Sequence, residues 1–476
     1  MTATLVQPGR KAGRHDIGRR LDRLPVGRVH RKIVVAIGLG LFFEVYEIFL
    51  SSTIATALKT EYGFGGTALQ VLMASSFIGM FIGAAAFGRI ADRIGRKKAF
   101  LLNLVWFSVW SIIGAFAPNP LMLVGARFMA GIGVGAEYPV ADSYLSDVLP
   151  KADRGRLAAW TYTCSFLAVP VLGFLSLSLN GHTIFGFAGW RFLLVIGAIG
   201  ALFVIVLRRG LPESPRWLAS VGRTDEAEAA VRAFEAGSAP ATGYADFDSE
   251  DYEVDDDSAE GDAHAAAEKP ATASDAIARL RLSPYRRRMV MLAVFHLFQP
   301  FGYYGFGTLA ALVLVSRGYD VTSSLLFTAV AFIGYPLGSL VSIPLLKRFE
   351  RKYLIMVTVA VMAICGVLFA TVSVPAMIVV FGLLTTAASN VFSNIYHVYQ
   401  AEIFPSDIRA TAVGWTYSLS RLSSAALPFI LIPVLNHYGA AAMFTVVLVA
   451  LAAAVAVLIP FGPRTTGRSL DEINPT

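Results

Sequence analysis

Long apolar stretches alternate with short polar breaks along almost the whole chain. A helix needs about 20 mostly apolar residues to cross about 30 Å of hydrocarbon, and twelve stretches come close to that length. The expected helices cover residues 33–55, 67–87, 99–117, 121–146, 158–179, 190–207, 289–315, 323–346, 353–372, 375–400, 410–434 and 439–461. The pattern therefore predicts an all-α membrane protein with twelve transmembrane helices.

Composition and charge support a membrane location. Hydrophobic residues make up 55% of the chain and charged residues only 15%, which leaves more apolar surface than a soluble protein carries. The net charge of +7 could indicate a nucleic-acid partner, but the lysines and arginines cluster at the ends of alternate apolar stretches. Because basic loops stay in the cytoplasm, we expect both termini there, no nucleic-acid partner, and a multi-pass protein of a bacterial inner or plasma membrane. The first span is then an uncleaved anchor.

The segment 211–288 is too polar to cross a membrane. Ser214 and Pro215 are a typical N-cap and first residue of a short helix, and a second helix is expected from Thr224. Residues 246–262 then carry ten acidic side chains and no basic one, which is typical of disordered chain. This acidic run is either a solvated linker or a partner-binding element, and the linker is the simpler interpretation.

The parts that flank this segment, 1–210 and 289–476, are related at a constant offset of 255 residues. The matching pairs are Arg93 and Arg348, Arg96 and Arg351, Lys97 and Lys352, Asp147 and Glu402, Pro150 and Pro405, Arg154 and Arg409, and Trp160-Thr161-Tyr162 and Trp415-Thr416-Tyr417. One offset that joins separated clusters predicts two pseudo-symmetric halves of six helices. In membrane proteins built this way, a substrate site lies between the halves near the bilayer midplane.

Several motifs lie at the ends of the expected helices. They are Gly88-Arg89-Ile90-Ala91-Asp92-Arg93-Ile94-Gly95-Arg96, Arg127 with Gly131, Gly133 and Gly135, Asp147 with Arg154, Glu402 with Arg409, Pro212-Glu213-Ser214-Pro215-Arg216-Trp217-Leu218, and Gly467-Arg468-Ser469-Leu470-Asp471-Glu472. Together they resemble the motifs of the major facilitator superfamily, in its sugar-porter and metabolite–proton symporter branches. The glycines after Arg127 are expected to let helices pack closely.

The resemblance implies a major facilitator fold with a gating latch in the cytoplasmic loops between the halves. The latch residues that it implies are Gly88, Asp92, Arg93, Gly95, Arg96, Asp147, Arg154, Glu402 and Arg409. The second copy of the loop departs from the pattern, since Lys347 stands where the first copy has Asp92. The charge pairing of that second copy is therefore expected to differ.

Ionisable residues inside a span cost about 2.5–3.5 kcal/mol to insert and usually mark function. Glu44 and Glu47 lie one turn apart in the first span, and the helical rise puts Glu47 at about the depth of Arg127 in the fourth. Burial favours a neutral carboxyl group and an adjacent arginine favours the ionised form, so a change in their pairing would move a proton. The resemblance implies that Glu47 is the proton-coupling carboxylate and Arg127 its partner. The alternative is a fixed ion pair. Because Glu44 also lies inside the span, it is a further candidate for a proton site or a substrate ligand.

Two other charged residues in the spans are candidate substrate ligands. Glu137 in the fourth span is a substrate ligand, a second proton site or a hydrogen-bonded packing residue. Arg421 lies near the middle of the eleventh span, which contains no acidic residue. We expect Arg421 to bind a substrate carboxylate, or else to pair with Glu44 or Glu137.

Aromatic and amide side chains in the spans offer stacking surfaces and oriented hydrogen bonds, as in many small-molecule sites. The candidates are Tyr162, Gln299, Tyr303, Tyr304, Asn390, Asn394 and Trp415, although such residues often only pack or lie at the membrane interface. Sugar porters carry paired glutamines in the seventh span, whereas only Gln299 stands there in this chain. An organic or aromatic acid therefore fits these residues better than a sugar.

These features predict a proton-coupled symporter that imports a small polar organic solute by alternating access. The alternatives are a sugar symporter and a transporter that exports a drug or metabolite by proton antiport. The chain shows no nucleotide-binding glycine loop with a lysine, no metal-ligand spacing and no nucleophile beside a base, so it is not expected to be an enzyme. We expect no metal or cofactor, protons as the coupling ion, and a monomer in the lipid bilayer.

Overall fold

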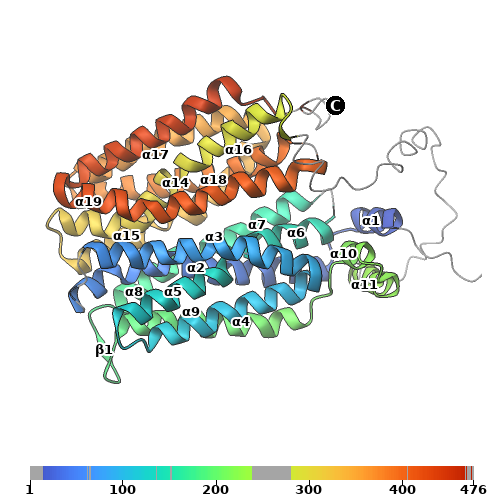
Figure 1. Cartoon of the computed structure of the whole chain (residues 1–476), viewed down its shortest axis with the longest axis horizontal. Helices are drawn as coiled ribbons and strands as arrows, with labels where there is room; N and C mark the ends of the chain where they lie inside the picture. The colour runs from blue at the N-terminus through green and yellow to red at the C-terminus, as the bar shows by residue number, and fades with distance from the viewer. Residues whose placement is uncertain are drawn as a thin grey trace, which may run out of the picture. The chain divides into compact units, whose positions relative to one another are not determined.

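A computed structural model describes residues 14–61, 66–135, 137–150, 153–238, 280–404 and 406–466, together with the single residues 63, 468 and 473. Almost every element in this part of the chain is a helix, as the apolar pattern predicts (Figure 1). The acidic run 246–262 lies outside the described residues, as do Pro405 and most of the motif 467–472.

The chain forms two compact units. Unit 1 comprises residues 1–51, 75–168 and 179–240, and unit 2 comprises residues 52–74, 169–178 and 241–476. The division of the sequence into 1–210, 211–288 and 289–476 stays a prediction.

The helices before residue 239 are α1 (Arg14–Arg23), α2 (Arg28–Glu61), α3 (Gly66–Ile94), α4 (Arg96–Ala115), α5 (Pro120–Val134), α6 (Glu137–Val148), α7 (Arg154–Phe166), α8 (Ala168–Leu179), α9 (Gly189–Arg209), α10 (Pro215–Ser220) and α11 (Thr224–Ser238). Strands β1 (Thr183–Ile184) and β2 (Phe187–Ala188) pair antiparallel between α8 and α9. Phe185 and Gly186 form their turn, and both have the positive φ that a two-residue hairpin turn of this kind requires.

The helices after residue 284 are α14 (Tyr285–Ser316), α15 (Val321–Ala331), α16 (Gly334–Arg348), α17 (Arg351–Thr371), α18 (Pro375–Glu402) and α19 (Ser406–Phe461). Helix α19 holds two of the expected spans, and they meet at Gly439, whose φ of 81° breaks the helix. An L-residue with a side chain rarely adopts this conformation, so glycine suits the break.

The expected count of spans fits the described helices. Ten of them are long and apolar enough to cross a bilayer, counting the pairs α7–α8 and α15–α16 once each. The longest of the ten, Ala412–Phe461, contains the two spans that meet at Gly439. The remaining span is built from the short apolar helix α5 with α6 after it. Twelve spanning segments result.

The sequence repeat is visible in the helix boundaries. Three pairs of helices begin 255 residues apart, namely α3 and α15, α4 and α17, and α5 and α18. Helices α2 and α14 end at the same offset. The offset read from the motifs therefore describes a structural repeat, and it relates each position in one half to a position in the other.

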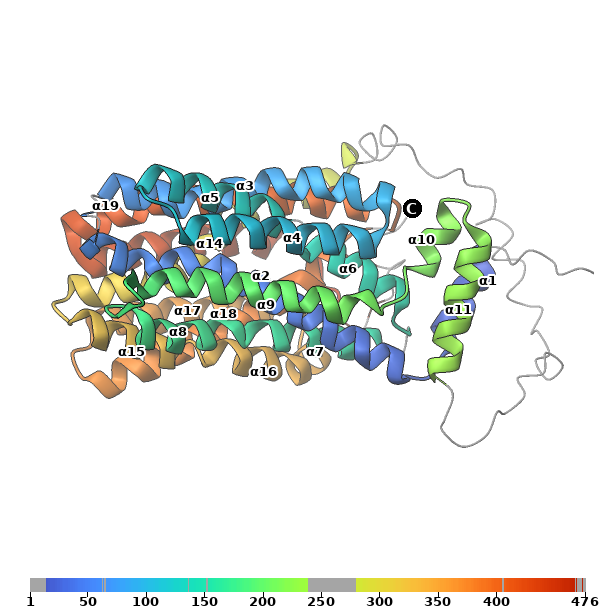
Figure 2. The same cartoon turned by 90° about the horizontal axis from the view of Figure 1, so that it is seen from below.

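The loop helices begin where their caps predict. The Ser214 hydroxyl accepts a hydrogen bond from the Trp217 amide, and Pro215 is the first residue of α10. Helices α1, α10 and α11 lie together at one end of unit 1 (Figures 1 and 2). Arg20 on α1 binds Glu228 and Glu235 on α11 at 2.8 and 2.9 Å, and this charge-assisted bonding holds the pKa of Glu228 below its usual value.

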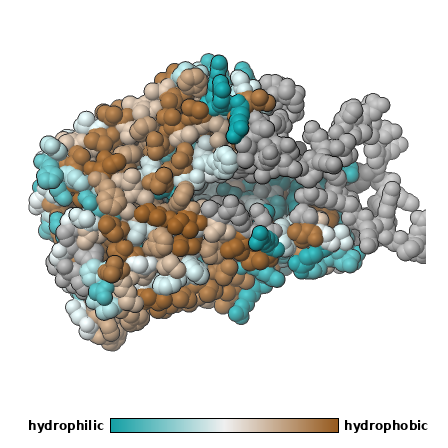
Figure 3. All heavy atoms as spheres, in the orientation of Figure 1, coloured by the Kyte–Doolittle hydropathy of each residue, from teal (hydrophilic) through white to brown (hydrophobic). Residues whose placement is uncertain are grey.

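Apolar side chains cover exposed faces of the long helices (Figure 3). On α9, for example, the exposed residues Ile199, Phe203 and Val206 follow one another at helical spacing along one face. A soluble domain rarely exposes such a stripe, whereas lipid chains solvate it well. The outward faces therefore match a hydrocarbon environment.

Glycines set the close approach of α3 and α5. A Cβ built on Gly131 would lie 2.3 Å from the carbonyl oxygen of Ser76, and one on Gly79 would lie 2.1 Å from that of Phe128. Both contacts are shorter than any van der Waals separation. The expectation that the glycines after Arg127 permit close packing is thus confirmed for Gly131.

Gly131→Ala should destabilise the protein, because the added methyl group forces α3 and α5 apart. Overpacking of this kind costs about 1–3 kcal/mol, so we expect a clearly lower midpoint of thermal denaturation in detergent. Gly125→Ala on the same helix is the matched control, since a Cβ there meets nothing within 4 Å. Equal midpoints for the two variants would contradict this packing.

Candidate functional site

Glu47 and Arg127 form an ion pair in the interior of unit 1. The Arg127 Nη1 atom donates to Glu47 Oε2, and the side chains are 2% and 0% exposed. Nη2 of the same guanidinium donates to the backbone oxygen of Glu47 at 2.7 Å. The equal depths inferred from the helical rise are therefore matched by a direct contact between α2 and α5.

Neutral side chains complete this ion pair. Ser111 on α4 donates to Glu47 Oε1 at 2.7 Å, and Arg127 Nε donates to the Ser51 hydroxyl at 3.0 Å. Ser51 in turn bonds to Ser76 at 3.2 Å. Both carboxylate oxygens and all three guanidinium nitrogens thus have partners, which a buried ion pair needs in order to offset its loss of hydration. The two serines beside the pair, Ser51 and Ser111, were not foreseen from the sequence.

Glu44 and Glu137 are also fully buried in unit 1. Glu137 pairs with Arg208 of α9, whose Nη1 lies 2.8 Å from Glu137 Oε1. This partner is not evident from the sequence, because Arg208 stands at the end of a span, next to the basic residues of the following loop. Its burial, at 1% exposure, is what separates it from the exposed Arg209 beside it.

Arg421 lies in an aromatic environment in unit 2. Its Nη1 donates to the Tyr304 hydroxyl at 2.9 Å, its Nη2 donates to the Tyr417 hydroxyl at 3.1 Å, and its guanidinium lies 5.2 Å from the centre of the Tyr417 ring. Tyr303 packs edge-on against Tyr304 with ring centres 4.8 Å apart. The structure therefore brings together three of the predicted residues, Arg421, Tyr303 and Tyr304.

Two histidines and an amide extend this aromatic cluster. His296 and His397 pack against Tyr417 with ring centres 5.6 and 5.5 Å away. Gln400 joins them, since its side chain bonds to His296 at 2.9 Å and to His397 at 3.2 Å. Gln400 was missed in the sequence, although its spacing of three residues from His397 places the two on one helical face.

Other predicted substrate residues have structural partners or different surroundings. The Asn390 amide donates to the Tyr335 backbone at 2.6 Å, and the Asn394 amide donates to Ser339 and Ser342, so both asparagines join α18 to α16. Gln299 is buried in α14.

The remaining two candidates differ in exposure and in partners. Trp415 is half exposed. Tyr162 belongs to unit 1, where its hydroxyl donates to Asp142 and its ring stacks on Tyr138. A substrate role for all these residues stays a prediction.

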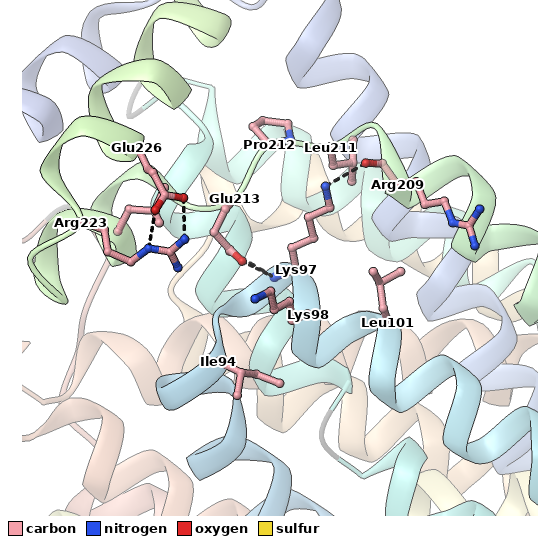
Figure 4. A pocket seen from close by; sticks show the side chains of 11 residues that line it. Ile94, Lys97, Lys98, Leu101, Arg209, Leu211, Pro212, Glu213, Arg223 and Glu226 are labelled. Atoms are coloured by element: carbon pink, nitrogen blue, oxygen red, sulfur yellow. Dashed lines mark hydrogen bonds and ion pairs between the residues drawn. The ribbon is translucent and has the colours of Figure 1, made fainter.

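The first latch motif is organised by Glu213, a residue that the sequence did not single out for this role. Its carboxylate accepts hydrogen bonds from the backbone amides of Arg96 and Lys97 at 3.1 Å, at the positive end of α4 (Figure 4). Gly95 turns the chain there with a φ of 99°. A Cβ on Gly95 would lie 2.4 Å from Glu213, so glycine is needed for both backbone shape and space.

The other latch residues also have partners within their own unit. In unit 1, Asp147 accepts from Ser214 at 2.7 Å, and Arg154 binds Asp22 at 2.9 Å. In unit 2, Glu402 binds Arg351 at 2.9 Å. Arg93 is exposed. Gly88, Asp92 and Arg409 lie outside the residues whose side chains are described, and the latch function stays a prediction.

A groove of about 490 Å³ opens beside the Glu213 contact (Figure 4). Its cationic wall includes Lys97, Lys98 and Arg209, and its apolar wall includes Ile94 and Leu101. Lys97 Nζ donates to the Arg209 backbone oxygen at 2.8 Å, which joins the ends of α4 and α9. The groove thus gives water access to the end of unit 1 that carries α10 and α11.

Comparison with known proteins agrees with this architecture. The family model described as "Sugar (and other) transporter" matches residues 32–476. The putative metabolite transport protein YyaJ of Bacillus subtilis is 29% identical, with 95% of this chain and 96% of YyaJ aligned. The niacin transporter NiaP of Acinetobacter baylyi is 28% identical, with 96% of this chain and 99% of NiaP aligned.

A solved structure supports the fold. The xylose transporter XylE of Escherichia coli, in a partially occluded inward-open conformation, superposes with a TM-score of 0.71 at 20% identity, over 93% of this chain and 99% of XylE. At that identity the likeness shows the fold alone. The family match over nearly the whole chain adds the class of function, and this chain belongs to the sugar (and other) transporter family of the major facilitator superfamily, whose members are membrane transporters and not enzymes.

Proposed function

We propose that this transporter is a proton symporter that imports a small aromatic or other organic acid by alternating access. The observation that carries the proton coupling is the buried Glu47–Arg127 pair in unit 1. An ionisable pair is costly inside a membrane, and it persists where its charge state is used. A conformational change that separates the two side chains would raise the proton affinity of Glu47, and their reunion would release the proton.

Arg421 supports an acidic substrate. A guanidinium recognises a carboxylate through two parallel hydrogen bonds, and the Tyr304 and Tyr417 hydroxyls that now accept from Arg421 can turn to donate to the same carboxylate. The tyrosine and histidine rings around it offer stacking surfaces for an aromatic ring. Niacin, named for the relative NiaP, is an aromatic carboxylic acid of this kind.

A sugar symporter is the second candidate, because the fold is shared with the xylose transporter. The buried Gln299 and the Asn390 and Asn394 amides could bind hydroxyl groups, but the two asparagine amides are already engaged by α16. Export by proton antiport would use the same buried pair for inward proton movement, with the solute moving outward.

The proposed orientation places the α10–α11 end of unit 1 in the cytoplasm. That end carries basic residues such as Lys97, Lys98 and Arg209, and basic loops are retained on the cytoplasmic side. Both termini would then be cytoplasmic. No metal or cofactor is required by this mechanism, and a monomer is sufficient.

Glu47→Gln should abolish uphill transport. The amide cannot take up a proton, so proteoliposomes with an acidic exterior should accumulate labelled nicotinate only to equilibrium, while exchange of internal for external nicotinate continues. Asp225→Asn is the matched control, because Asp225 is exposed on α11 and is not among the residues that line the groove. If Glu47→Gln accumulates nicotinate to the wild-type level, the proposed proton coupling at Glu47 is wrong and the Glu47–Arg127 pair is a fixed structural contact.

Arg421→Lys should weaken the binding of aromatic carboxylates. A hydrogen bond to a charged group contributes about 1.5–3 kcal/mol, so we expect the Kd for nicotinate to rise about tenfold to a hundredfold. Thermal-shift titration of the purified protein with nicotinate, benzoate and xylose measures this, since a ligand stabilises the folded state by mass action. Arg287→Lys, an exposed position on α14, is the control. A shift with xylose and none with the acids would favour the sugar symporter.

A further inference from the structure

The second buried ion pair of unit 1, between Glu137 and Arg208, is built differently from the first. Arg208 is anchored without the carboxylate, because its Nε and Nη2 atoms donate to the backbone oxygens of Ala36 and Ile37 at 3.2 and 3.4 Å. Its guanidinium also lies 4.5 Å from the centre of the Phe100 ring. Glu137 could therefore become neutral while the arginine keeps its place.

The Glu137 carboxylate is also held less firmly than that of Glu47, because neither of its oxygens makes a hydrogen bond of good geometry among the described residues. Glu47 binds Arg127 and Ser111 directly, and its backbone oxygen binds Arg127 as well. Glu137 has the 2.8 Å contact with Arg208 and the neighbouring side chain of Asn103. Protonating Glu137 therefore costs less hydrogen bonding at the carboxylate than protonating Glu47 does.

The repeat shows that the fold does not require charges at these places. At the offset of 255 residues, Glu44, Glu47 and Glu137 correspond to Gln299, Gly302 and Phe392. These residues are all buried in unit 2, so the same architecture is packed there with neutral groups. Since buried ion pairs seldom stabilise more than apolar packing does, the charges in unit 1 point to a function.

Helix α2 connects the two ion pairs. Gly40, Glu44 and Glu47 follow at intervals of four and three residues, so they lie on one side of the helix, with the Cβ atoms of Glu44 and Glu47 about 5–6 Å apart. A Cβ on Gly40 would lie 1.6 Å from Arg208 Nη2 and 3.0 Å from Glu137 Oε1. Because Gly40 has no side chain, the Glu137–Arg208 pair can occupy the space beside α2 at this position.

A small cavity borders this second pair on its Arg208 side. The cavity has room for about one water molecule, and its wall also includes Lys97, Phe100 and Tyr144. This cavity shares Lys97 and Leu211 with the groove of Figure 4. The Glu137–Arg208 pair thus lies between the buried carboxylates of α2 and the open end of unit 1.

We propose that Glu137, held beside Arg208, is a second proton-binding site through which the proton taken up at Glu47 leaves the membrane. The inference rests on the proposed proton coupling at Glu47. The O–H bond at Glu47 breaks, Glu44 accepts and passes on the proton, and an O–H bond forms at Glu137. That bond then breaks toward water in the groove, while Arg208 stays protonated throughout. Among the described residues, the titratable side chains of Lys97 on α4 and Tyr144 on α6 line the cavity beside Arg208, and Glu44 lies one turn from Gly40 on α2.

The test compares three variants. Two are the single substitutions Glu137→Gln and Glu47→Gln, and the third is a neutral double variant that combines Glu137→Gln with Arg208→Gln. Each is reconstituted with a pH gradient of about one unit, which can drive about tenfold accumulation of labelled nicotinate per coupled proton. We expect both Glu137 variants to lose this accumulation and to keep nicotinate binding in thermal-shift titration. The double variant leaves no unpaired charge of this pair in the interior. A loss of accumulation in it therefore cannot be caused by an unpaired Arg208 that destabilises the fold.

Infrared difference spectra between acidic and neutral pH distinguish the two sites. The wild type should show the C=O stretch of more than one protonated carboxyl group, Glu137→Gln should lose one component, and Glu47→Gln should lose a different one. If Glu137→Gln accumulates nicotinate like the wild type and loses no component, the second site is disproved while the role of Glu47 stands. If only Glu47→Gln behaves like the wild type, the proposed function fails instead.

Discussion

The cost of placing charge inside hydrocarbon shapes this molecule more than any other constraint. Its spans are mostly apolar, and among the described residues the buried carboxylates of Glu47 and Glu137 each lie against an arginine. The Glu47–Arg127 pair has every polar atom of both side chains engaged, from three helices and the Ser51–Ser76 contact. Such a pair is stable only while its partners stay in place, so any movement of α2 against α5 changes the charge that the site prefers.

The internal repeat lets the two halves be compared as variants of one design. Helix boundaries agree at an offset of 255 residues, yet the chemistry at equivalent positions differs. Unit 1 holds the buried glutamates, whereas unit 2 holds Arg421 among tyrosines and histidines. In the proposed function, unit 1 handles the proton and unit 2 recognises the substrate, a separation that alternating access can couple.

Much of this arrangement could be predicted from the sequence, because it depends on one-dimensional patterns. Apolar stretches gave the spans, the caps at Ser214 gave the loop helix, and the helical rise put Glu47 level with Arg127. What could not be predicted depends on helix rotation and on contacts between distant segments. The position of Arg208 at the end of a span is typical of a loop residue, but its side chain is buried. Likewise, the spacing of Glu213 does not indicate that its carboxylate accepts from the first backbone amide of α4. The asparagines of α18 show the same limit, because their residue type suits a binding site and the spacing gave no sign that their amides also join α18 to α16.

The central claim is that solute and proton move together, and proton flux measured during transport tests it most directly. An inward gradient of nicotinate is applied to lightly buffered proteoliposomes without a pH gradient, and the external pH is followed against protein-free liposomes. The account predicts a rise in external pH that keeps pace with nicotinate entry and disappears in Glu47→Gln. Entry of nicotinate without any change in pH, or with a fall in external pH, would contradict it.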